Sequence, residues 1–302
     1  NYNNASDIFY DAHSNALFIT DHDNSRVKKH SLEGAFISQF GTSGSGDGQF
    51  LDAQSVTTDD SGRIIVVDSE PNARVEVFSP TGTFLFKFGN PGDGDGLFTV
   101  PVGAAVRSNG DIVVASAHTN SLQEFDSTGN WIRTFKDAGD NAWQFMGPYT
   151  LAFDSEDNYV LLDVYHKAIQ RYSNDRVFVS GIRNSGFVSG RLTSPMSIAY
   201  DSTGNLYVLD NGAYNGRIQK FTNGGTYLST IVEPPVFGLE AYNMVIKNDE
   251  IYVADNISFK KFSLTGTLLL TVEAAGTGDG QFAGARGIAV DSTGNIYVSD
   301  AG

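Results

Sequence analysis

The chain has 302 residues, 40% of them hydrophobic and 12% aromatic, which is enough for one large core or two ordinary ones. Its 35 acidic and 20 basic residues give a net charge of −15, which disfavours nucleic acid as a partner because the overall field repels a polyanion. The chain has no cysteine, which excludes disulfides and thiolate metal sites. No apolar stretch approaches the roughly 20 residues of a membrane span, so we expect no membrane insertion.

An apolar run that ends in a polar residue recurs along the whole chain. The runs include IIVVD, YVLLD, LYVLD and IYVSD, and their last residues are spaced 45 to 48 positions apart. These last residues are Asp21, Asp68, Ser116, Asp163, Asp210, Asp255 and Asp300. One strand-like run precedes each of them across a turn such as DSTGN, and two more follow in all but the last unit. A fixed period of this length indicates a repeat architecture.

Four short strands per unit predict an all-β fold, a β-propeller of four-stranded antiparallel blades, because this arrangement hides most sheet edges. We expect a single propeller over residues 1–302, with units at about 5–48, 49–96, 97–144, 145–190, 191–237, 238–280 and a partial unit at 281–302. Seven inner strand pairs predict six or seven blades, the last one incomplete. An unfinished blade exposes an edge, which we expect to recruit a strand from a continuing polypeptide or to support self-association with a neighbouring chain.

The phrases GTGDGQFAGARGIAVDSTGNIYVSD and RIQKF resemble the NHL repeat. The resemblance covers essentially the whole chain and is specific in the second, fifth and seventh units. It is weaker in the fourth and sixth, where GIRNSGFVSGRLTSP and VEPPVFGLEAYN stand at the inter-unit links. The resemblance implies a propeller, usually of six blades, that mostly binds other molecules. Some animal members bind RNA through a positively charged face, but the corresponding face is acidic here, so we expect no nucleic acid.

Residues that differ between units are the candidates for function, because the shared residues serve the fold. The residue five before the end of each first strand should lie at the central mouth, on the same face as the inter-unit links and the loops after the second strands. The mouth residues are Gln54, Val102, Tyr149, Met196, Tyr242 and Arg286, and the rim adds Trp143, Tyr165 and Tyr214. Aromatic, methionine and arginine side chains are typical of interfaces and ligand mouths, although scattered exposed aromatics also occur without a role. We predict that a protein or glycan binds here.

Acidic residues in the glycine-rich links raise the question of calcium, which binds six to eight oxygen atoms. The candidates are Asp47, Asp93, Asp95 and Asp279 in these links, and the segment Asp21-His22-Asp23-Asn24. That segment resembles the start of an EF-hand loop, but Arg26 stands where the loop needs glycine. We favour ordered turns, since glycine and aspartate are the usual turn residues, and calcium is the one cofactor left open. The aspartate that ends each second strand should likewise organise the following turn.

Relatives of this architecture include zinc-dependent lyases and calcium-dependent lactonases. His22, His118 and His166 follow second strands on one face, and together with Asp21 and Asp23 they are the candidate metal ligands. They occupy non-equivalent positions, and the chain has neither an HExxH motif nor a nucleophile elbow, so a non-catalytic protein is favoured over an enzyme. The leading hypothesis is a binding propeller outside the cell or at its surface. The alternatives are a structural subunit of an extracellular assembly or filament, and a zinc- or calcium-dependent hydrolase or lyase.

Overall fold

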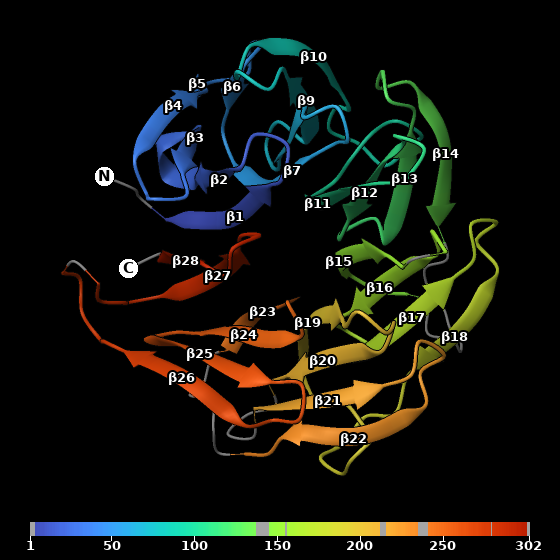
Figure 1. Ribbon diagram of the computed structural model, residues 1–302. Coiled ribbons are helices and arrows are strands. Elements are labelled where there is room, and N and C mark those ends of the chain that lie inside the picture. Colours follow the sequence, from blue (N-terminus) through green and yellow to red (C-terminus); the bar gives the residue numbers. More distant parts are fainter. Residues whose placement is uncertain are drawn as a thin grey trace. The chain divides into compact units, whose positions relative to one another are not determined.

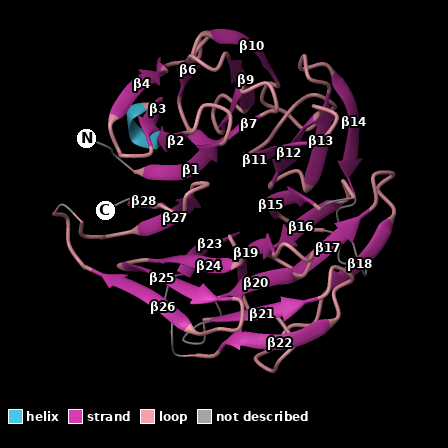
Figure 2. Cartoon of the chain, in the orientation of Figure 1, coloured by secondary structure: helices cyan, strands magenta, loops and turns pink. Residues whose placement is uncertain are grey.

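The computed structural model describes residues 4–136, 145–154, 156–211, 216–234, 241–278 and 280–300. Strands dominate these residues, and their one helical turn is η1 (His22–Asn24) (Figure 2). Six four-stranded antiparallel sheets, each with its strands in chain order, precede a two-stranded hairpin, which is the β-propeller architecture that the repeat predicts. No helix in the described ranges is long and apolar enough to cross a membrane.

The chain divides into two compact units, Asn1–Leu151 and Ala152–Gly302. The first unit holds three complete blades (Figure 1). Blade one comprises β1 (Ala5–Asp11), β2 (Ala16–Asp21), β3 (Arg26–Ser31) and β4 (Phe36–Phe40). Blade two comprises β7 (Ala53–Thr58), β8 (Ile64–Asp68), β9 (Arg74–Phe78) and β10 (Phe84–Phe88). Blade three comprises β11 (Pro101–Val106), β12 (Ile112–Ser116), β13 (Ser121–Phe125) and β14 (Trp131–Lys136). A short parallel pair, β5 (Thr42–Ser43) and β6 (Gln49–Phe50), lies in the link between blades one and two.

Blade four begins at the end of the first unit and continues in the second, with β15 (Pro148–Phe153), β16 (Tyr159–Asp163), β17 (Ala168–Tyr172) and β18 (Phe178–Ile182). Blade five comprises β19 (Pro195–Tyr200), β20 (Leu206–Asp210), β21 (Arg217–Phe221) and β22 (Tyr227–Val232). Blade six comprises β23 (Ala241–Lys247), β24 (Glu250–Asp255), β25 (Ser258–Ser263) and β26 (Leu268–Glu273). The final hairpin is β27 (Ala285–Val290) and β28 (Ile296–Asp300).

The second strand of a blade is deeply buried, and in blades two and three the third strand is equally so. All five residues of β8, β12, β16 and β20 are buried. Blades stack face to face, so both faces of this strand meet apolar neighbours, which explains a continuous Val, Ile and Leu run in place of alternation. Val66 and Phe78 of blade two, for example, share one cluster with Phe18 and Val27 of blade one.

β28 differs from the other second strands because most of its residues are only partly buried. Among the described residues it pairs with β27 alone. The sequence therefore predicted the incomplete last blade correctly. Strand recruitment by this edge, and the assignment of the whole chain to one domain, stay predictions.

The aspartate at the end of the second strand serves the fold in two ways. In blade four, Asp163 Oδ1 accepts the backbone N–H of His166 at 2.9 Å in the following loop, as the sequence predicts, whereas in blades two and five the carboxylate bonds the preceding link. Asp68 Oδ1 accepts the backbone N–H of Leu51 at 3.0 Å and of Asp52 at 2.9 Å. Asp210 Oδ1 accepts the N–H groups of Thr193 and Ser194 at 2.8 and 2.7 Å. In both blades the carboxylate therefore anchors the link that precedes the first strand.

Candidate functional site

The upper face of a blade is defined here as the edge where its second strand ends and its first strand begins. The anchoring aspartates tie this edge together, since each bonds the link before the first strand from the end of the second. The links between blades and the loops after second strands therefore lie on the upper face. These are the segments in which sequence differences between units suggest function.

The predicted mouth residues occupy the extra position of a β-bulge. In blade two, Ala53 pairs with Asp68 and Ser55 pairs with Val67, so Gln54 has no partner of its own in the register. The same shift occurs in blades three, five and six and in the final hairpin, at Val102, Met196, Tyr242 and Arg286. A bulge residue departs from the regular in-and-out alternation of a strand, and bulges commonly re-aim a side chain next to a binding site. The fold thus sets these side chains apart in each blade.

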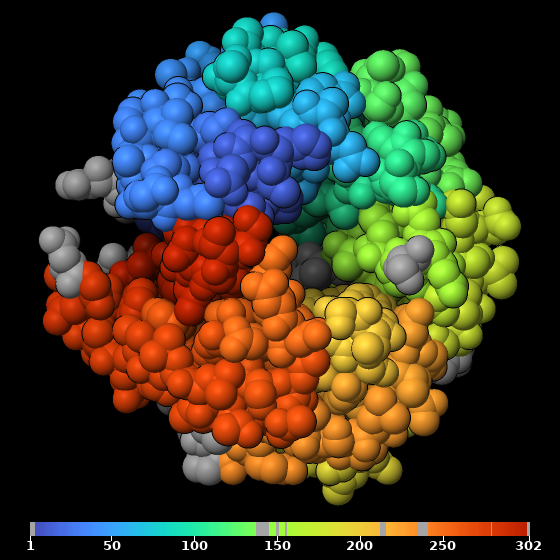
Figure 3. Space-filling view, in the orientation of Figure 1, coloured from blue at the N-terminus to red at the C-terminus, as the bar shows by residue number. Residues whose placement is uncertain are grey.

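Three of these residues form a series on the second unit. β19 lies against β23, and β23 lies against β27, so Met196, Tyr242 and Arg286 occupy equivalent positions on adjacent strands. The Arg286 guanidinium carbon is 5.9 Å from the centre of the Tyr242 ring, a cation–π contact. Figure 3 shows the surface of the final hairpin directly beside that of blade six. Gln54 and Val102 belong to the first unit, where both are partly buried.

The remaining predicted contact residues differ in what the structure describes. Tyr165, in the loop after β16, is 71% exposed, and its neighbour Val164 is also exposed. Trp143 and Tyr214 lie outside the described residues. Tyr149 lies in β15, but its side chain is not described.

Two exposed apolar side chains on the upper face are absent from the predicted set. Phe187 and Val188, in the link into blade five, are 65% and 62% exposed. The first link has Ser45 and Gly46 at the equivalent positions. The contrast between GFVSG and GSGDG is visible in the sequence. In the sequence, this contrast resembles a weak match to the repeat. In the structure, the link keeps the repeated loop and only its side chains differ.

The backbone of this link is nevertheless the same as in the first link. Gly186 has φ +144 and Gly44 has φ +147, and both glycines precede the two positions in question. The N–H of Gly186 donates to the carbonyl of Leu192 at 2.9 Å, and that of Gly44 donates to the carbonyl of Phe50 at 3.1 Å. The loop conformation therefore does not require the apolar side chains.

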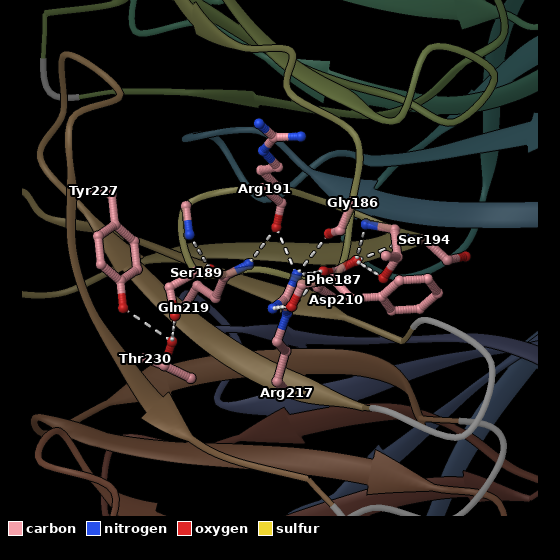
Figure 4. A network of polar contacts seen from close by, with 12 residues as sticks. Gly186, Phe187, Ser189, Arg191, Ser194, Asp210, Arg217, Gln219, Tyr227 and Thr230 are labelled. Atoms are coloured by element: carbon pink, nitrogen blue, oxygen red, sulfur yellow. Dashed lines mark hydrogen bonds and ion pairs between the residues drawn. The ribbon is translucent and has the colours of Figure 1, made fainter.

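Arg217 holds this link from beneath (Figure 4). Its guanidinium donates to the carbonyl oxygens of Phe187 at 2.5 Å, Gly186 at 3.1 Å and Arg191 at 2.6 Å. The same group donates to Asp210 Oδ2 at 3.0 Å, and both side chains are buried. Charge-assisted hydrogen bonds of this kind are the strong ones. Phe187 and Val188 are thus displayed to solvent on a fixed backbone.

The candidate metal ligands are engaged with other protein groups. Asp21 pairs with Arg26 at 2.7 Å and with Lys28 at 3.3 Å. The Nδ1 and Nε2 atoms of His22 lie 2.6 Å from Asp23 and 2.7 Å from Asp52. The hydrogen bond from His22 lowers the pKa of Asp23, whereas burial raises the pKa of Asp52.

The other two histidines stand apart from this group. His166 Nδ1 lies 2.8 Å from Asp163, and His118 is exposed. Within the described ranges, no three His, Cys, Asp or Glu side chains come together in a group that could hold a metal ion. A metal site at these positions stays a prediction.

The link aspartates bond groups of the protein in the same way. Asp47 pairs with Lys87 at 2.9 Å, and Asp93 accepts the Thr99 hydroxyl at 2.7 Å. Asp95 accepts the hydroxyl of Thr134 at 2.6 Å. Asp279 lies outside the described residues. These contacts agree with a role in ordering the links.

A family model described as the NHL repeat matches residues 192–221, which span the first three strands of blade five. The chain is an NHL-repeat β-propeller. The match falls on the blade whose Arg217 and Asp210 form the network described above. Gln219, two residues after Arg217, also donates to the carbonyl of Arg191 at 2.7 Å, so three residues of the matched segment hold the link in place.

No curated protein matches the sequence of this NHL propeller with significance. Among solved structures it is similar to a streptogramin B lyase, with 14% identity, a TM-score of 0.77, and coverage of 99% of this chain and 91% of that one. A virginiamycin B lyase from Staphylococcus aureus gives 13% identity, a TM-score of 0.75, and coverage of 99% and 92%. The WD40 propeller domain of Doa1 gives 12% identity, a TM-score of 0.71, and coverage of 99% and 90%. At these identities the likeness shows the fold alone.

Proposed function

We propose that this NHL propeller binds a partner protein through the upper face of its second unit. The observation that carries the proposal is the exposure of Phe187 and Val188 on a link whose backbone needs neither side chain. Full burial of an apolar side chain of this size contributes about 1.5–3 kcal/mol. That free energy is not gained in the folded chain, whereas a partner that covers the two side chains would gain it.

Other upper-face residues of the second unit have the composition of an interface. Met196, Tyr242 and Arg286 stand on adjacent bulges, and Tyr165 extends from the loop after β16. Aromatic residues, methionine and arginine are enriched at protein interfaces relative to the rest of the surface. A glycan is the other ligand class that this face permits. An exposed aliphatic side chain next to an exposed aromatic one, Val188 beside Phe187, favours a protein. A location outside the cell, or at its surface, is part of the proposal.

The decisive variant copies one link of the chain onto another. Phe187→Ser combined with Val188→Gly installs the residues of the first link, Ser45 and Gly46, on an equivalent backbone. We expect quantitative affinity capture from the native source to lose a specific partner by about tenfold or more. The control is Leu228→Ser, because Leu228 is 47% exposed on the outer strand β22, away from the upper face.

Thermal unfolding should show that the double variant and the control fold as the parent does. Equal capture by the parent chain and the double variant would remove this surface from the proposal. Loss of the partner in the Leu228→Ser control alone would move the interface to the outer strands.

A metal-dependent lyase or hydrolase is the second candidate function. It is favoured by the likeness in fold to the streptogramin B lyases, one of which is a catalytically inactive S. aureus variant solved with quinupristin. Incubation of the chain with quinupristin and added divalent metal, followed by mass spectrometry, separates the candidates. A cleaved product would favour the enzyme, and intact quinupristin would count against this lyase activity.

A further inference from the structure

Two hollows flank the turn that joins β19 to β20, at the end of blade five opposite its upper face. The larger has a volume of about 390 Å³ and lies toward the turn of blade six, between Ser202 and the segment 246–249. The smaller has a volume of about 320 Å³ and extends from Phe153 and Asp154 to Asn223. Tyr200, Asp201 and Ser202 line both hollows. The two spaces therefore share one wall.

The larger hollow lies where blade six departs from the repeat. In blade five the turn is DSTGN, and the N–H of Asp201 donates to the carbonyl of Asn205 at 3.0 Å. In blade six Lys247 pairs directly with Glu250, which leaves the two-residue turn 248–249. Both turn residues have positive φ, 53 and 58, as in a tight type I′ hairpin. The shorter turn of blade six reaches less far along the DSTGN turn beside it.

The smaller hollow is open where an earlier blade is filled. A Cβ atom added to Gly204, which lines this hollow, would meet nothing within 4 Å. The equivalent glycine of blade two is Gly62, and a Cβ added there would lie 3.7 Å from the Cβ of His13 in blade one. A Cβ atom added to Gly294, in the same DSTGN turn of the final hairpin, would also meet nothing within 4 Å, so the open space occurs at both of these turns and is narrower at the turn of blade two.

The shared wall holds an aromatic ring in place. The Tyr200 hydroxyl donates to Asn223 Oδ1 at 3.3 Å, which links the ring to the β21–β22 turn. Burial raises the pKa of Tyr200, so its hydroxyl stays neutral at physiological pH. Asp201 on the same wall is paired with Lys220 at 3.1 Å. The wall therefore presents a positioned ring and no unpaired negative charge.

The rim of the larger hollow carries hydrogen-bond donors and acceptors, including one positively and one negatively charged side chain. The Ser202 hydroxyl donates to Asp249 Oδ1 at 2.8 Å, which joins the turns of blades five and six. Asp249 is exposed and keeps further acceptor capacity, since a carboxylate accepts about four hydrogen bonds. Lys247 is half-buried at this rim, and within the described ranges it forms no ion pair. The exposed amide of Asn248 lies between them in sequence.

We propose that these hollows form a binding site for a neutral pyranose unit of a glycan. A pyranose ring has a face of C–H groups, which suits an aromatic ring, and hydroxyls that both donate and accept, which suit an amide, a carboxylate and an ammonium group. Each volume lies near the lower end of the range of small-ligand sites, about 300–1,000 Å³, which suits one sugar unit. Asp249 and Lys247 balance in charge, so an uncharged ligand fits better than an acidic sugar.

The probes are methyl glycosides of glucose, galactose and mannose, with glucuronic acid as the charged comparison. Saturation-transfer difference NMR and calorimetry on the full chain should detect at least one neutral glycoside, with a dissociation constant on the order of 1 mM. Ser202→Trp places a large ring between the two hollows, and we expect it to weaken binding by about tenfold or more. Tyr200→Leu keeps an apolar side chain but loses the ring face, so it should have an effect in the same direction.

The matched control is Ser292→Trp, because Ser292 occupies the equivalent place in an identical DSTGN turn and is equally exposed. This variant should bind the glycoside as the parent does. No binding of any neutral glycoside to the parent chain overturns the proposal, as does undiminished binding by Ser202→Trp. Tighter binding of glucuronic acid than of the neutral sugars would overturn the assignment of a neutral ligand.

Discussion

The guanidinium of Arg217 donates to the carbonyl oxygen of Phe187 at 2.5 Å, across 30 residues of sequence. The same side chain contacts Asp210 and two further carbonyl groups of the link. One arginine on a third strand therefore connects the end of the second strand with the link before the first. Arg74 makes similar contacts in blade two, to the carbonyls of Ser45, Gly46 and Gln49, of which Ser45 and Gln49 are equivalent to Phe187 and Arg191.

Replacement of Arg217 by alanine should destabilise the fold. Loss of one partner leaves Asp210 buried without its cation, a change that typically costs about 3–5 kcal/mol. We expect a loss of about 3 kcal/mol in the free energy of unfolding, measured by urea denaturation. Arg217→Lys should lose less, because lysine keeps the charge but not the fork of donors. The exposed Arg191 supplies the control, and an equal effect of Arg191→Ala would contradict the role assigned to Arg217.

Glu76 should make stability depend on pH. Burial raises its pKa from 4.5 to about 7, although Arg74 opposes this shift. Between these values the folded state holds a proton that the unfolded state has released. The free energy of unfolding therefore falls by at most about 3 kcal/mol as pH rises from about 4.5 to about 7. Above about pH 7 this contribution no longer changes.

The variant Glu76→Gln should remove this dependence. Glutamine already stands at the equivalent position in blade five, where Gln219 Oε1 accepts the N–H of Gly190 at 2.8 Å, as Glu76 Oε2 accepts that of Gly48. We expect the variant to be more stable than the parent near pH 8 by about 1–3 kcal/mol and equal to it near pH 4. Parallel stability curves for the two proteins across this range would contradict the shifted pKa.

Tyr242 and Arg286 should be coupled energetically. A cation–π pair at an exposed site contributes about 0.5–1 kcal/mol. A double-mutant cycle of Tyr242→Ala with Arg286→Ala should show this coupling energy. The Tyr242→Phe variant should retain most of the interaction with Arg286, because phenylalanine keeps the ring. Additive effects of Tyr242→Ala and Arg286→Ala on the free energy of unfolding would mean that the contact has no energetic role.

Chelation should leave the links intact. Asp47, Asp93 and Asp95 bond Lys87, Thr99 and Thr134, so we expect the links to keep their order without calcium. We expect the melting temperature to be the same in EDTA and in calcium. A rise in the melting temperature with added calcium, saturating at a defined stoichiometry, would instead establish a bound ion.

Blade architecture was predictable because hairpin chemistry is local. In the DSTGN turn, Asp201 Oδ1 accepts the N–H groups of Thr203 and Asn205, so a five-residue pattern is enough to mark a hairpin. Counting along each unit selects Met196 from the sequence, but the bulge there was not predictable, because a register shift depends on the partner strand. The hollows beside Tyr200 were equally hidden, since they arise from turns of three blades.

Phe187 and Val188 show a different limit. Their exposure follows from a backbone that copies the first link, and only the shared φ angle and hydrogen bond show that the two loops are equivalent. In the sequence alone, the same residues indicate only a weaker match to the repeat. All the predicted contact residues stay predictions, and the side chains of Tyr149, Trp143 and Tyr214 are not described.

The bulge at the start of these first strands lets the side chain vary without a change in the sheet. The scaffold accepts glutamine, valine, methionine, tyrosine or arginine there without a change of register, as Gln54, Val102, Met196, Tyr242 and Arg286 show. Single substitutions at these positions can therefore exchange one chemistry for another while the sheet persists. A library randomised at the bulges alone would sample new recognition surfaces on an unaltered framework.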